Sequence, residues 1–138
     1  MALKPLYLAD KSAYARMHHT AVADRLTPLL VDGYVATCPI IDLEVLYSAR
    51  SRSDYEDILV ERGSLPSLPI NEAVTERAVA VQRLLAQRGQ HRLPLPDLFI
   101  AAVAEINDLT VIHYDADYDR IASVTGQATE WVVPRGSL

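Results

Sequence analysis

The sequence predicts an α/β fold with a mostly parallel β-sheet, in a single domain that spans residues 1–138. Short apolar runs of strand length alternate along the chain with longer segments in which apolar residues recur at helical spacing. The 138 residues suit one domain, and 50% of them are hydrophobic and 22% charged, as is usual for a globular protein. No repeat, low-complexity tract or linker divides the sequence.

The first half of the chain is predicted to supply two strands and several helices. In order, we expect a strand at 6–9, a helical turn at 12–16, a helix at 20–31, a strand at 34–38, a helix from 39 to about 50 and a helix at 53–61. Asp32 and Gly33 end the helix that precedes them, whereas Pro39 favours the first turn of the next one. Residues 68–70 form a brief extended segment, in which Pro69 makes a central strand unfavourable.

The second half of the chain predicts helices and strands in alternation. In order, we expect a helix from 72 to about 87 capped by Asn71, a loop at 89–96, a helix at 98–104, a strand at 110–113, a short helix at 115–123 and a strand at 130–133. Seven consecutive apolar residues from Leu98 to Ala104, preceded by Pro96, indicate a helix that is buried on most sides. The order of the strands in the sheet does not follow from this pattern.

Composition and charge exclude several classes of protein. The formal net charge is −5 at pH 7, which argues against a protein coated in positive charge to bind nucleic acid without selectivity. The single cysteine excludes a framework of internal disulfides and suits a reducing compartment. No apolar run approaches the ~20 residues of a membrane helix, and the segment from Met1 to Asp10 has neither a long apolar region nor a small-residue cleavage site. We therefore expect a cytoplasmic protein without a membrane segment.

Four carboxylates are predicted to meet at one edge of the sheet. Asp10 follows the first strand directly and Asp115 follows a later strand, and ligands of parallel sheets bind beyond the carboxyl ends of the strands. Asp97 lies in the first turn of the buried helix, and Glu44 lies in the second turn of the helix that Pro39 opens. Because crossover helices run antiparallel to the strands, their N-termini lie on the same edge.

Each acid also has an explanation that needs no functional site. Asp10, Asp97 and Asp115 could cap helices or favour the helix dipole. Glu44 lies among apolar residues and needs a partner or water, whereas its neighbour Asp42 turns to roughly the opposite side of the helix. If the four acids do cluster, they repel one another, and a divalent cation holds such a group together. Ligation by oxygen alone favours Mg²⁺ or Mn²⁺ over Zn²⁺.

Other residue types that bind metals or act as nucleophiles form no pattern. His18, His19, His91 and His113 lack a paired spacing for a metal, and we expect His113 in the core or at the sheet edge. Cys38 has no second thiol and is expected to be a small buried residue. The sequence contains no dinucleotide-binding glycine motif, no Walker loop and no nucleophile elbow.

Four segments around these acids carry a resemblance to a known family. They are Leu-Ala-Asp10-Lys11-Ser12-Ala13, Asp-Leu-Glu44-Val-Leu-Tyr-Ser-Ala-Arg, Pro-Asp97-Leu-Phe-Ile-Ala-Ala and His-Tyr-Asp115-Ala-Asp117-Tyr-Asp119-Arg-Ile. Together, in this order and over essentially the whole chain, they resemble the PIN-domain ribonucleases, and most closely the VapC toxins of type II toxin–antitoxin systems. Each segment alone is a weak signal, whereas all four in order are a strong one.

The resemblance implies a PIN-like three-layer fold with a short sheet flanked by helices, and it assigns a role to each acid. Asp10, Glu44, Asp97 and Asp115 correspond to the catalytic acidic quartet that binds Mg²⁺ or Mn²⁺. Asp117 corresponds to a variable fifth acid. Since Asp115, Asp117 and Asp119 lie so close in sequence, the fourth position is open among them. Ser12 corresponds to a small polar residue that supports the first acid or a metal-bound water.

Basic residues near these segments are candidates for RNA binding. Eleven of the 13 basic residues are arginines, which grip phosphates with two hydrogen bonds, although a codon bias would produce the same ratio. Arg16, Arg50 and Arg92 flank the motifs and could contact RNA or remain solvated. Lys11 departs from the small residue frequent at its position in the family, and it could reach a phosphate or point to solvent.

The resemblance also implies a function and partners. It implies a toxin endoribonuclease that hydrolyses phosphodiester bonds in structured RNA, either tRNA or ribosomal RNA, through metal-activated water. It further implies a cognate VapB-like antitoxin, whose apolar helix would end in a basic side chain, and a homodimer, with the helices at 20–31 and 53–61 as candidate contacts. A catalytically inactive PIN-like binding module is the alternative. A receiver domain would need a late lysine, and a metal-dependent adhesion module would need serine where Tyr14 stands.

Overall fold

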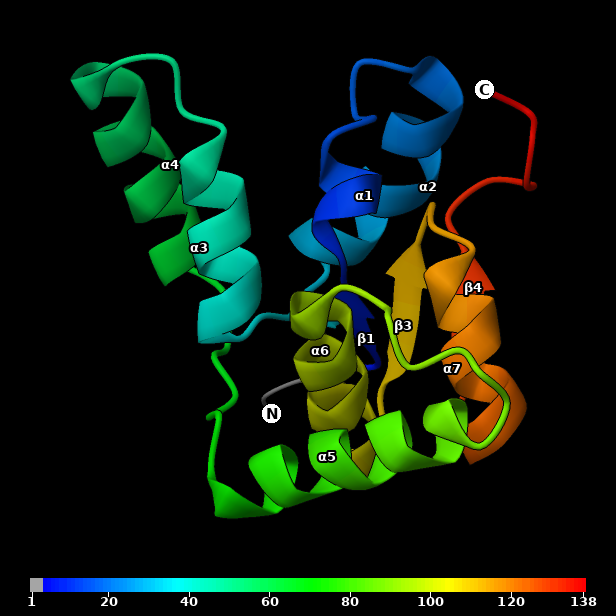
Figure 1. Cartoon of the computed structure of the whole chain (residues 1–138). Coiled ribbons are helices and arrows are strands. Elements are labelled where there is room, and N and C mark those ends of the chain that lie inside the picture. The colour runs from blue at the N-terminus through cyan, green and yellow to red at the C-terminus, as the bar shows by residue number, and fades with distance from the viewer. Residues whose placement is uncertain (1–3) are drawn as a thin grey trace.

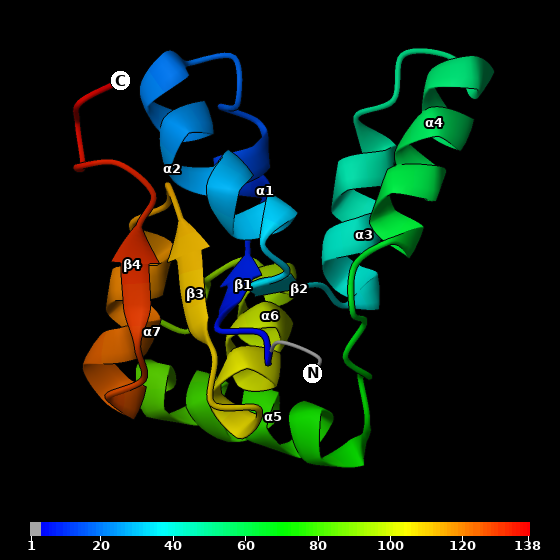
Figure 2. The same cartoon turned by 180° about the vertical axis from the view of Figure 1, so that it is seen from behind.

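A parallel four-stranded sheet lies at the centre of the computed structural model, which describes residues 4–138. Its strands are β1 (Tyr7–Ala9), β2 (Val35–Ala36), β3 (Thr110–His113) and β4 (Thr129–Trp131). They lie in the order β2-β1-β3-β4, and every neighbouring pair is parallel. The arrowheads of β1, β3 and β4 therefore point to the same edge (Figure 2). The predicted α/β class with a parallel sheet is confirmed.

Helices cover both faces of this sheet. They are α1 (Lys11–Tyr14), α2 (Thr20–Val31), α3 (Pro39–Tyr47), α4 (Arg52–Gly63), α5 (Glu72–Ala86), α6 (Leu95–Ile106) and α7 (Asp117–Thr125). The helices α5, α6 and α7 lie in front of the sheet, and α1 and α2 lie toward its other face (Figures 1 and 2). The pair α3 and α4 stands to one side of this three-layered body (Figure 1).

Two apolar cores hold the three layers together. Leu8 and Val111 point into the core beneath α5, α6 and α7, whereas their neighbours Ala9 and Ile112 point into the core beneath α1 and α2. This alternation follows from the period of two residues in a strand. Both faces of the strands are thus buried, which is typical of parallel sheets. None of the helices within residues 4–138 has the length and hydrophobicity of a membrane-spanning segment. The prediction that the segment from Met1 to Asp10 carries no cleavage site falls partly on residues 1–3, which lie outside the described residues.

Local signals in the sequence set several helix ends. Asn71 caps α5, since its Oδ1 accepts a hydrogen bond from the backbone of Val74 at 3.0 Å. Pro39 opens α3 as predicted. Gly33 follows α2 with a φ of +79°, a conformation that glycine adopts without steric cost. The expected ends at these positions are confirmed.

Other boundaries differ from the prediction by a few residues. The helix α6 begins at Leu95 rather than Leu98, because a proline in the first turn loses no intrahelical hydrogen bond. The helix α3 ends at Tyr47 rather than near Arg50, because Ser51 already caps α4 through the backbone of Asp54. The first helical turn spans Lys11–Tyr14, not 12–16.

The two outer strands also differ from the predicted ones, since both are shorter and the last one begins a residue earlier. β2 spans only Val35–Ala36, because Thr37 turns away to pair with the extended segment near Ser67. There the backbone of Thr37 donates to Pro66 and accepts from Leu68, each at 2.8 Å. Pro69 lies outside the named strands, as predicted. The last strand is 129–131 rather than 130–133.

Candidate active site

An open pocket at the carboxyl edge of the sheet gathers the four acids of the predicted quartet. It has a volume of about 520 Å³. Asp10 reaches it from the end of β1, Glu44 from α3, Asp97 from α6 and Asp115 from the segment after β3. The remaining lining residues are Lys11, Ser12, Ala15, Arg16, Pro94, Tyr114 and Ala116.

Asp10 caps α1 and faces the pocket at the same time. Its Oδ2 accepts a hydrogen bond from the backbone of Ser12 at 2.9 Å, and its Oδ1 accepts one from the Tyr118 hydroxyl at 2.7 Å. The residue is only 4% exposed. The capping explanation and the functional explanation of Asp10 are therefore compatible.

Asp97 is a buried acid with several other carboxylates close to it. It lies in the first turn of α6 and is 6% exposed. Within residues 4–138, its Oδ2 is buried without a hydrogen-bond partner. Burial, followed by the nearby charges of Asp10, Asp115, Asp117 and Glu44, raises the pKa of the Asp97 carboxyl to about 8. An ionised Asp97 consequently needs positive charge next to it.

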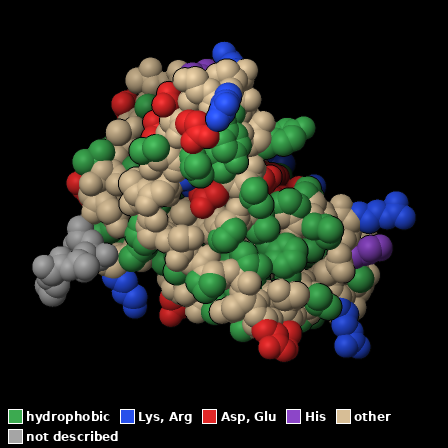
Figure 3. Space-filling view, turned by 90° about the vertical axis from the view of Figure 1, so that its left-hand side faces the viewer, with side chains coloured by type: hydrophobic (Ala, Val, Ile, Leu, Met, Phe, Trp, Pro, Cys, Tyr) green, Lys and Arg blue, Asp and Glu red, His purple; other side chains and the backbone are tan. Residues whose placement is uncertain are grey.

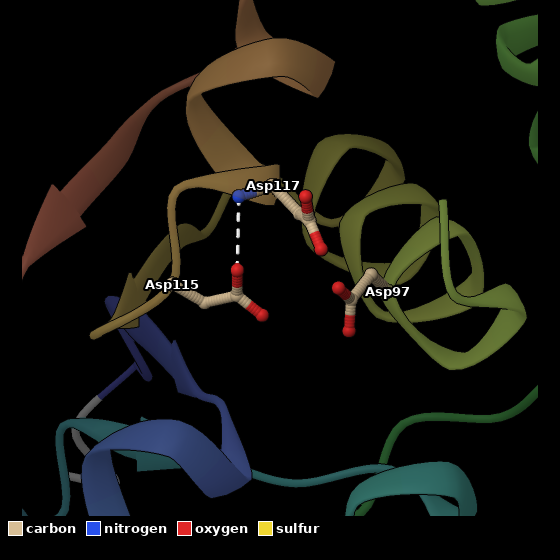
Figure 4. A group of neighbouring side chains, drawn as sticks. All are labelled: Asp97, Asp115 and Asp117. Carbon is tan, nitrogen blue, oxygen red and sulfur yellow. Dashed lines mark hydrogen bonds between the residues drawn. The ribbon is translucent and has the colours of Figure 1, made fainter. Parts of the chain in front are cut away.

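Asp97, Asp115 and Asp117 converge on one point (Figure 4). Each offers a carboxylate oxygen, and these oxygens lie within 4.8 Å of one another. Asp115 is oriented by its own loop, because its Oδ1 accepts from the backbone of Asp117 at 2.9 Å. This bond also delays the start of α7 to Asp117 instead of the predicted 115. Asp119 instead accepts hydrogen bonds from Trp131 on β4, at 3.3 Å.

Glu44 and Asp42 lie in different environments, although they are two residues apart. Among the described residues, Glu44 Oε1 is buried and has no hydrogen-bond partner. Burial and the charge of Asp10 raise the Glu44 pKa, and Lys11 opposes this shift. Asp42 pairs with Arg62 at 2.9 Å, on the other side of α3. The predicted separation of the two acids is thus observed.

Ser12 joins two of the elements that line the pocket. Its hydroxyl accepts a hydrogen bond from the backbone of Tyr114 at 2.9 Å, which connects α1 to the segment after β3. Arg16 donates to the Ser12 carbonyl at 2.9 Å and lies 4.7 Å from the centre of the Tyr114 ring. Ser12 therefore fixes the relative position of the two segments that carry Asp10 and Asp115.

The four basic candidates are placed differently. Lys11 and Arg16 line the acidic pocket. Arg50 lines a second pocket between α1, α3 and α4, and Lys11 lines both. Arg92 is exposed in the loop before α6 and does not line the acidic pocket.

Tyr118 contacts two of the acids and His113 contacts the backbone of a third, and neither was assigned a role in the site from the sequence. The Tyr118 hydroxyl lies 3.4 Å from Asp97 Oδ1 as well as 2.7 Å from Asp10 Oδ1. Burial and the charge of Asp10 raise its pKa well above the usual range, so that the phenol stays protonated. His113 is buried, and its Nδ1 accepts from the backbone of Asp115 at 3.1 Å. Burial lowers the pKa of His113, which favours the neutral ring that this bond requires.

The residues of the pocket fit a hard divalent cation. Two of the acids hold buried oxygens without partners among residues 4–138, Oδ2 of Asp97 and Oε1 of Glu44. Buried carboxylates without partners are costly, and an oxygen-rich site favours Mg²⁺ or Mn²⁺. The pocket therefore has the clustered carboxylates and the buried, unpartnered oxygens that a cation site requires.

Comparisons with known proteins agree with this geometry. The model of the PIN domain family matches residues 8–124. Ribonuclease VapC51 from Mycobacterium tuberculosis is 44% identical over 138 residues, which cover 100% of this chain and 99% of that protein. This chain belongs to the VapC ribonucleases of the PIN-domain family. All five acids of this VapC chain that the resemblance assigned to the metal lie inside the matched region.

Solved structures share the fold of this VapC chain. VapBC2 from Rickettsia felis, bound to a promoter DNA fragment, superposes with a TM-score of 0.74 at 16% identity. The superposition covers 91% of this chain and 97% of the Rickettsia felis chain. A toxin-antitoxin complex from Klebsiella pneumoniae superposes with a TM-score of 0.69 at 19% identity, with coverages of 92% and 98%. At such identities the likeness establishes the VapC fold alone. The predicted three-layer PIN-like architecture is confirmed.

Proposed function

We propose that this VapC-family chain is a toxin endoribonuclease that hydrolyses phosphodiester bonds in structured RNA, either tRNA or ribosomal RNA, with Mg²⁺ as cofactor and Mn²⁺ as a substitute. The observation that carries this proposal is the convergence of Asp97, Asp115 and Asp117 within 4.8 Å, with Asp97 Oδ2 buried and unpartnered in the described part of the chain. The membership of this chain in the VapC ribonucleases supports the same reaction.

Several acids would bind the cation together. Asp10, Glu44, Asp97 and Asp115 would bind it directly or through water, with Asp117 as the fifth acid. When bound, a divalent cation supplies the positive charge that favours attack of water on a phosphodiester and stabilises the leaving oxygen. The protein's contribution is orientation, since backbone and side-chain donors fix Asp10 and Asp115. Ser12 would support Asp10 by locking α1 against the segment that carries Asp115.

The substrate would reach the acidic pocket beside positive side chains. Lys11 and Arg16 line it, and Arg50 extends the positive charge into the adjoining pocket. These groups would contact phosphates and position the RNA without reading its sequence. Arg92 would contribute only to RNA that extends along the loop before α6.

An antitoxin would supply the control that such an enzyme needs. A further pocket of about 460 Å³, here called the apolar groove, lies between α2, α3 and α4. Apolar residues make up most of its lining, including Met17, Leu30, Val45 and Ile58. An apolar helix of a cognate VapB-like antitoxin would fit there and place a basic side chain toward the acidic pocket. The solved protein from Klebsiella pneumoniae with the same fold is a toxin-antitoxin complex, which supports an antitoxin as the kind of partner.

We further propose a single cytoplasmic domain that forms a homodimer. Hydrophobic side chains gather on the face that Figure 3 shows, and exposed patches of this kind mark interfaces. On the predicted contact helices, the large exposed hydrophobic side chains are Val31, Tyr55, Leu59 and Val60. Light scattering at micromolar concentration would give about twice the 15.3 kDa of one chain, whereas the mass of one chain would contradict the dimer.

The decisive experiment is cleavage of total bacterial RNA by the purified chain. We expect cleavage with Mg²⁺ or Mn²⁺, none with a chelator, and none by Asp97→Asn. Asp119→Asn is the matched control, because Asp119 binds Trp131 instead of joining the convergent acids. Cleavage by Asp97→Asn at the wild-type rate would refute the site. Failure of the wild-type chain to cut RNA with either cation would favour an inactive binding module.

A further inference from the structure

A tyrosine hydroxyl lies between two acids that come from distant parts of the chain. Tyr118, on α7, is fully buried. Its hydroxyl is 2.7 Å from Oδ1 of Asp10, which is 108 positions away, and 3.4 Å from Oδ1 of Asp97, which is 21 positions away. Within residues 4–138, no other side chain donates a hydrogen bond to Asp10 or lies as close to both acids.

The hydroxyl has a single proton to donate. The shorter distance directs this proton to Asp10, whereas 3.4 Å is beyond the usual range for such a bond. The other oxygen of Asp10 accepts from the backbone of Ser12 at 2.9 Å. Both oxygens of Asp10 are therefore held by donors from two different helices, and each keeps a lone pair for another partner.

The ring of Tyr118 has a separate role from its hydroxyl. It packs in the core with Ile121 and lies 4.9 Å from the ring of His113, measured between ring centres. A phenylalanine would fill the same space. The hydroxyl alone contacts the acids, so its contribution can be removed without a cavity in the core.

We propose that Tyr118 is a positioning residue, whose hydroxyl fixes the carboxylate of Asp10 in the orientation that lets Asp10 and Asp97 share one cation. This inference rests on the cation site proposed above. Partners that orient metal ligands contribute to affinity without touching the metal, and their loss lowers affinity roughly 10- to 100-fold. Tyr118 connects α7, which also carries Asp117, to the end of β1. The start of α7 and the end of β1, which both lie at the pocket, are thereby tied together.

The test compares Mn²⁺ binding by calorimetry in wild-type protein and Tyr118→Phe. We expect the variant to fold and to bind Mn²⁺ about 10-fold or more weakly. Tyr7→Phe is the control, because it removes a hydroxyl that hydrogen-bonds to Arg25 outside the acidic pocket. It should bind Mn²⁺ as the wild type does.

A second readout separates positioning from general damage to the fold. In RNA cleavage, Tyr118→Phe should need a higher Mg²⁺ concentration for half-maximal rate, and excess Mg²⁺ should restore most of the activity. Far-UV circular dichroism and a melting curve recorded without Mg²⁺ identify a folding defect separately, because Mg²⁺ stabilises any folded state that binds it and so rescues such a defect as well. If the variant does not fold, Mg²⁺ should still alter the tyrosine absorbance of the wild-type protein, and this change should persist in Tyr114→Phe.

The outcomes distinguish this inference from the function on which it rests. If the wild-type protein binds no Mn²⁺, the cation site itself is wrong. If the wild-type protein binds Mn²⁺ and Tyr118→Phe binds it equally well, only the role of Tyr118 is refuted. A loss of activity in Tyr118→Phe that excess Mg²⁺ does not restore would also overturn the inference, as would the absence of a tyrosine signal where the variant fails to fold.

Discussion

The guanidinium of Arg62 donates from Nε to Oδ1 of Asp42 across 2.9 Å, in a largely buried position between α4 and α3. The same guanidinium donates to the hydroxyl of Thr37 at 2.8 Å and lies 4.6 Å from the centre of the Tyr14 ring. It therefore ties α4 to α3, to α1 and to the chain just after β2. This network accounts for Asp42 and leaves Glu44 free to face the acidic pocket.

Removal of Arg62 should destabilise the protein far more than removal of an exposed arginine. Arg62→Ala leaves Asp42 partly buried without its cation, so we expect a loss of about 2–4 kcal/mol. Arg25→Ala is the matched control, because its partner Glu130 and Arg25 itself are both more than a third exposed, and such pairs contribute about 1 kcal/mol or less. Urea denaturation measures both, and equal losses would contradict a special role for Arg62.

The stability of the ion-free protein should fall as the pH rises from about 4 to about 8. Over this window the unfolded Asp97 has lost its proton, since its ordinary pKa is about 3.9, whereas the folded residue keeps it because its pKa is about 8. Because only the folded state binds this proton within the window, a lower pH stabilises the folded state. For this one proton, the free energy of unfolding falls by at most about 1.4 kcal/mol per pH unit as the pH rises.

Asp97→Asn tests this dependence in thermal unfolding with a chelator. The amide keeps the shape of the side chain without the charge, so the variant should be more stable than the wild type at pH 7 and less sensitive to pH. Asp119→Asn should behave as the wild type does. A wild-type stability that is flat or rising between pH 5 and pH 8, and unaffected by Asp97→Asn, would show that Asp97 ionises normally.

The chain offers a matched pair of lysines for a test of RNA binding. Lys11 lines the acidic pocket, whereas Lys4 is exposed and does not line it. Lys11→Ala should raise KM more than it lowers kcat, and it should reduce the salt dependence of RNA binding by about one counterion. Lys4→Ala should change neither quantity. Equal effects of the two substitutions would mean that Lys11 is a solvated surface charge.

Inhibition by the antitoxin should depend on Mg²⁺. A basic side chain that enters the acidic pocket competes with the cation, and its truncation in the antitoxin should cost about 2–5 kcal/mol of binding. The truncated antitoxin would still occupy the apolar groove, but added Mg²⁺ should release activity from it more readily. Inhibition that responds neither to this residue nor to Mg²⁺ would place the antitoxin away from the acids.

The sequence was sufficient for the class of fold and for the convergence of the acids, because both follow from periodicity and from the geometry of parallel strands. Pro39, Gly33 and Asn71 set helix ends through local backbone chemistry, which sequence reveals directly. The ends of α3 and α6 were less predictable, since neighbouring caps and prolines compete for the same residues.

The parts of the site that sequence reasoning missed depend on contacts between distant segments. Tyr118 lies between two aspartates in sequence, and only the packing of α7 against the sheet brings its hydroxyl to Asp10. The one local signal was its spacing from Ile121, which indicates an inward-facing helix position. His113 was expected in the core or at the sheet edge, but its hydrogen bond to the backbone of Asp115 depends on the turn after β3.

Anomalous scattering from a crystal soaked in Mn²⁺ would locate the cation directly. We predict a peak within coordination distance of Asp97 and Asp115, in the pocket that Asp10 and Glu44 also line, and no such peak in Asp97→Asn. Wild-type crystals that show no peak in this pocket, while the same protein cleaves RNA with Mn²⁺, would contradict the assignment of these acids to the cation.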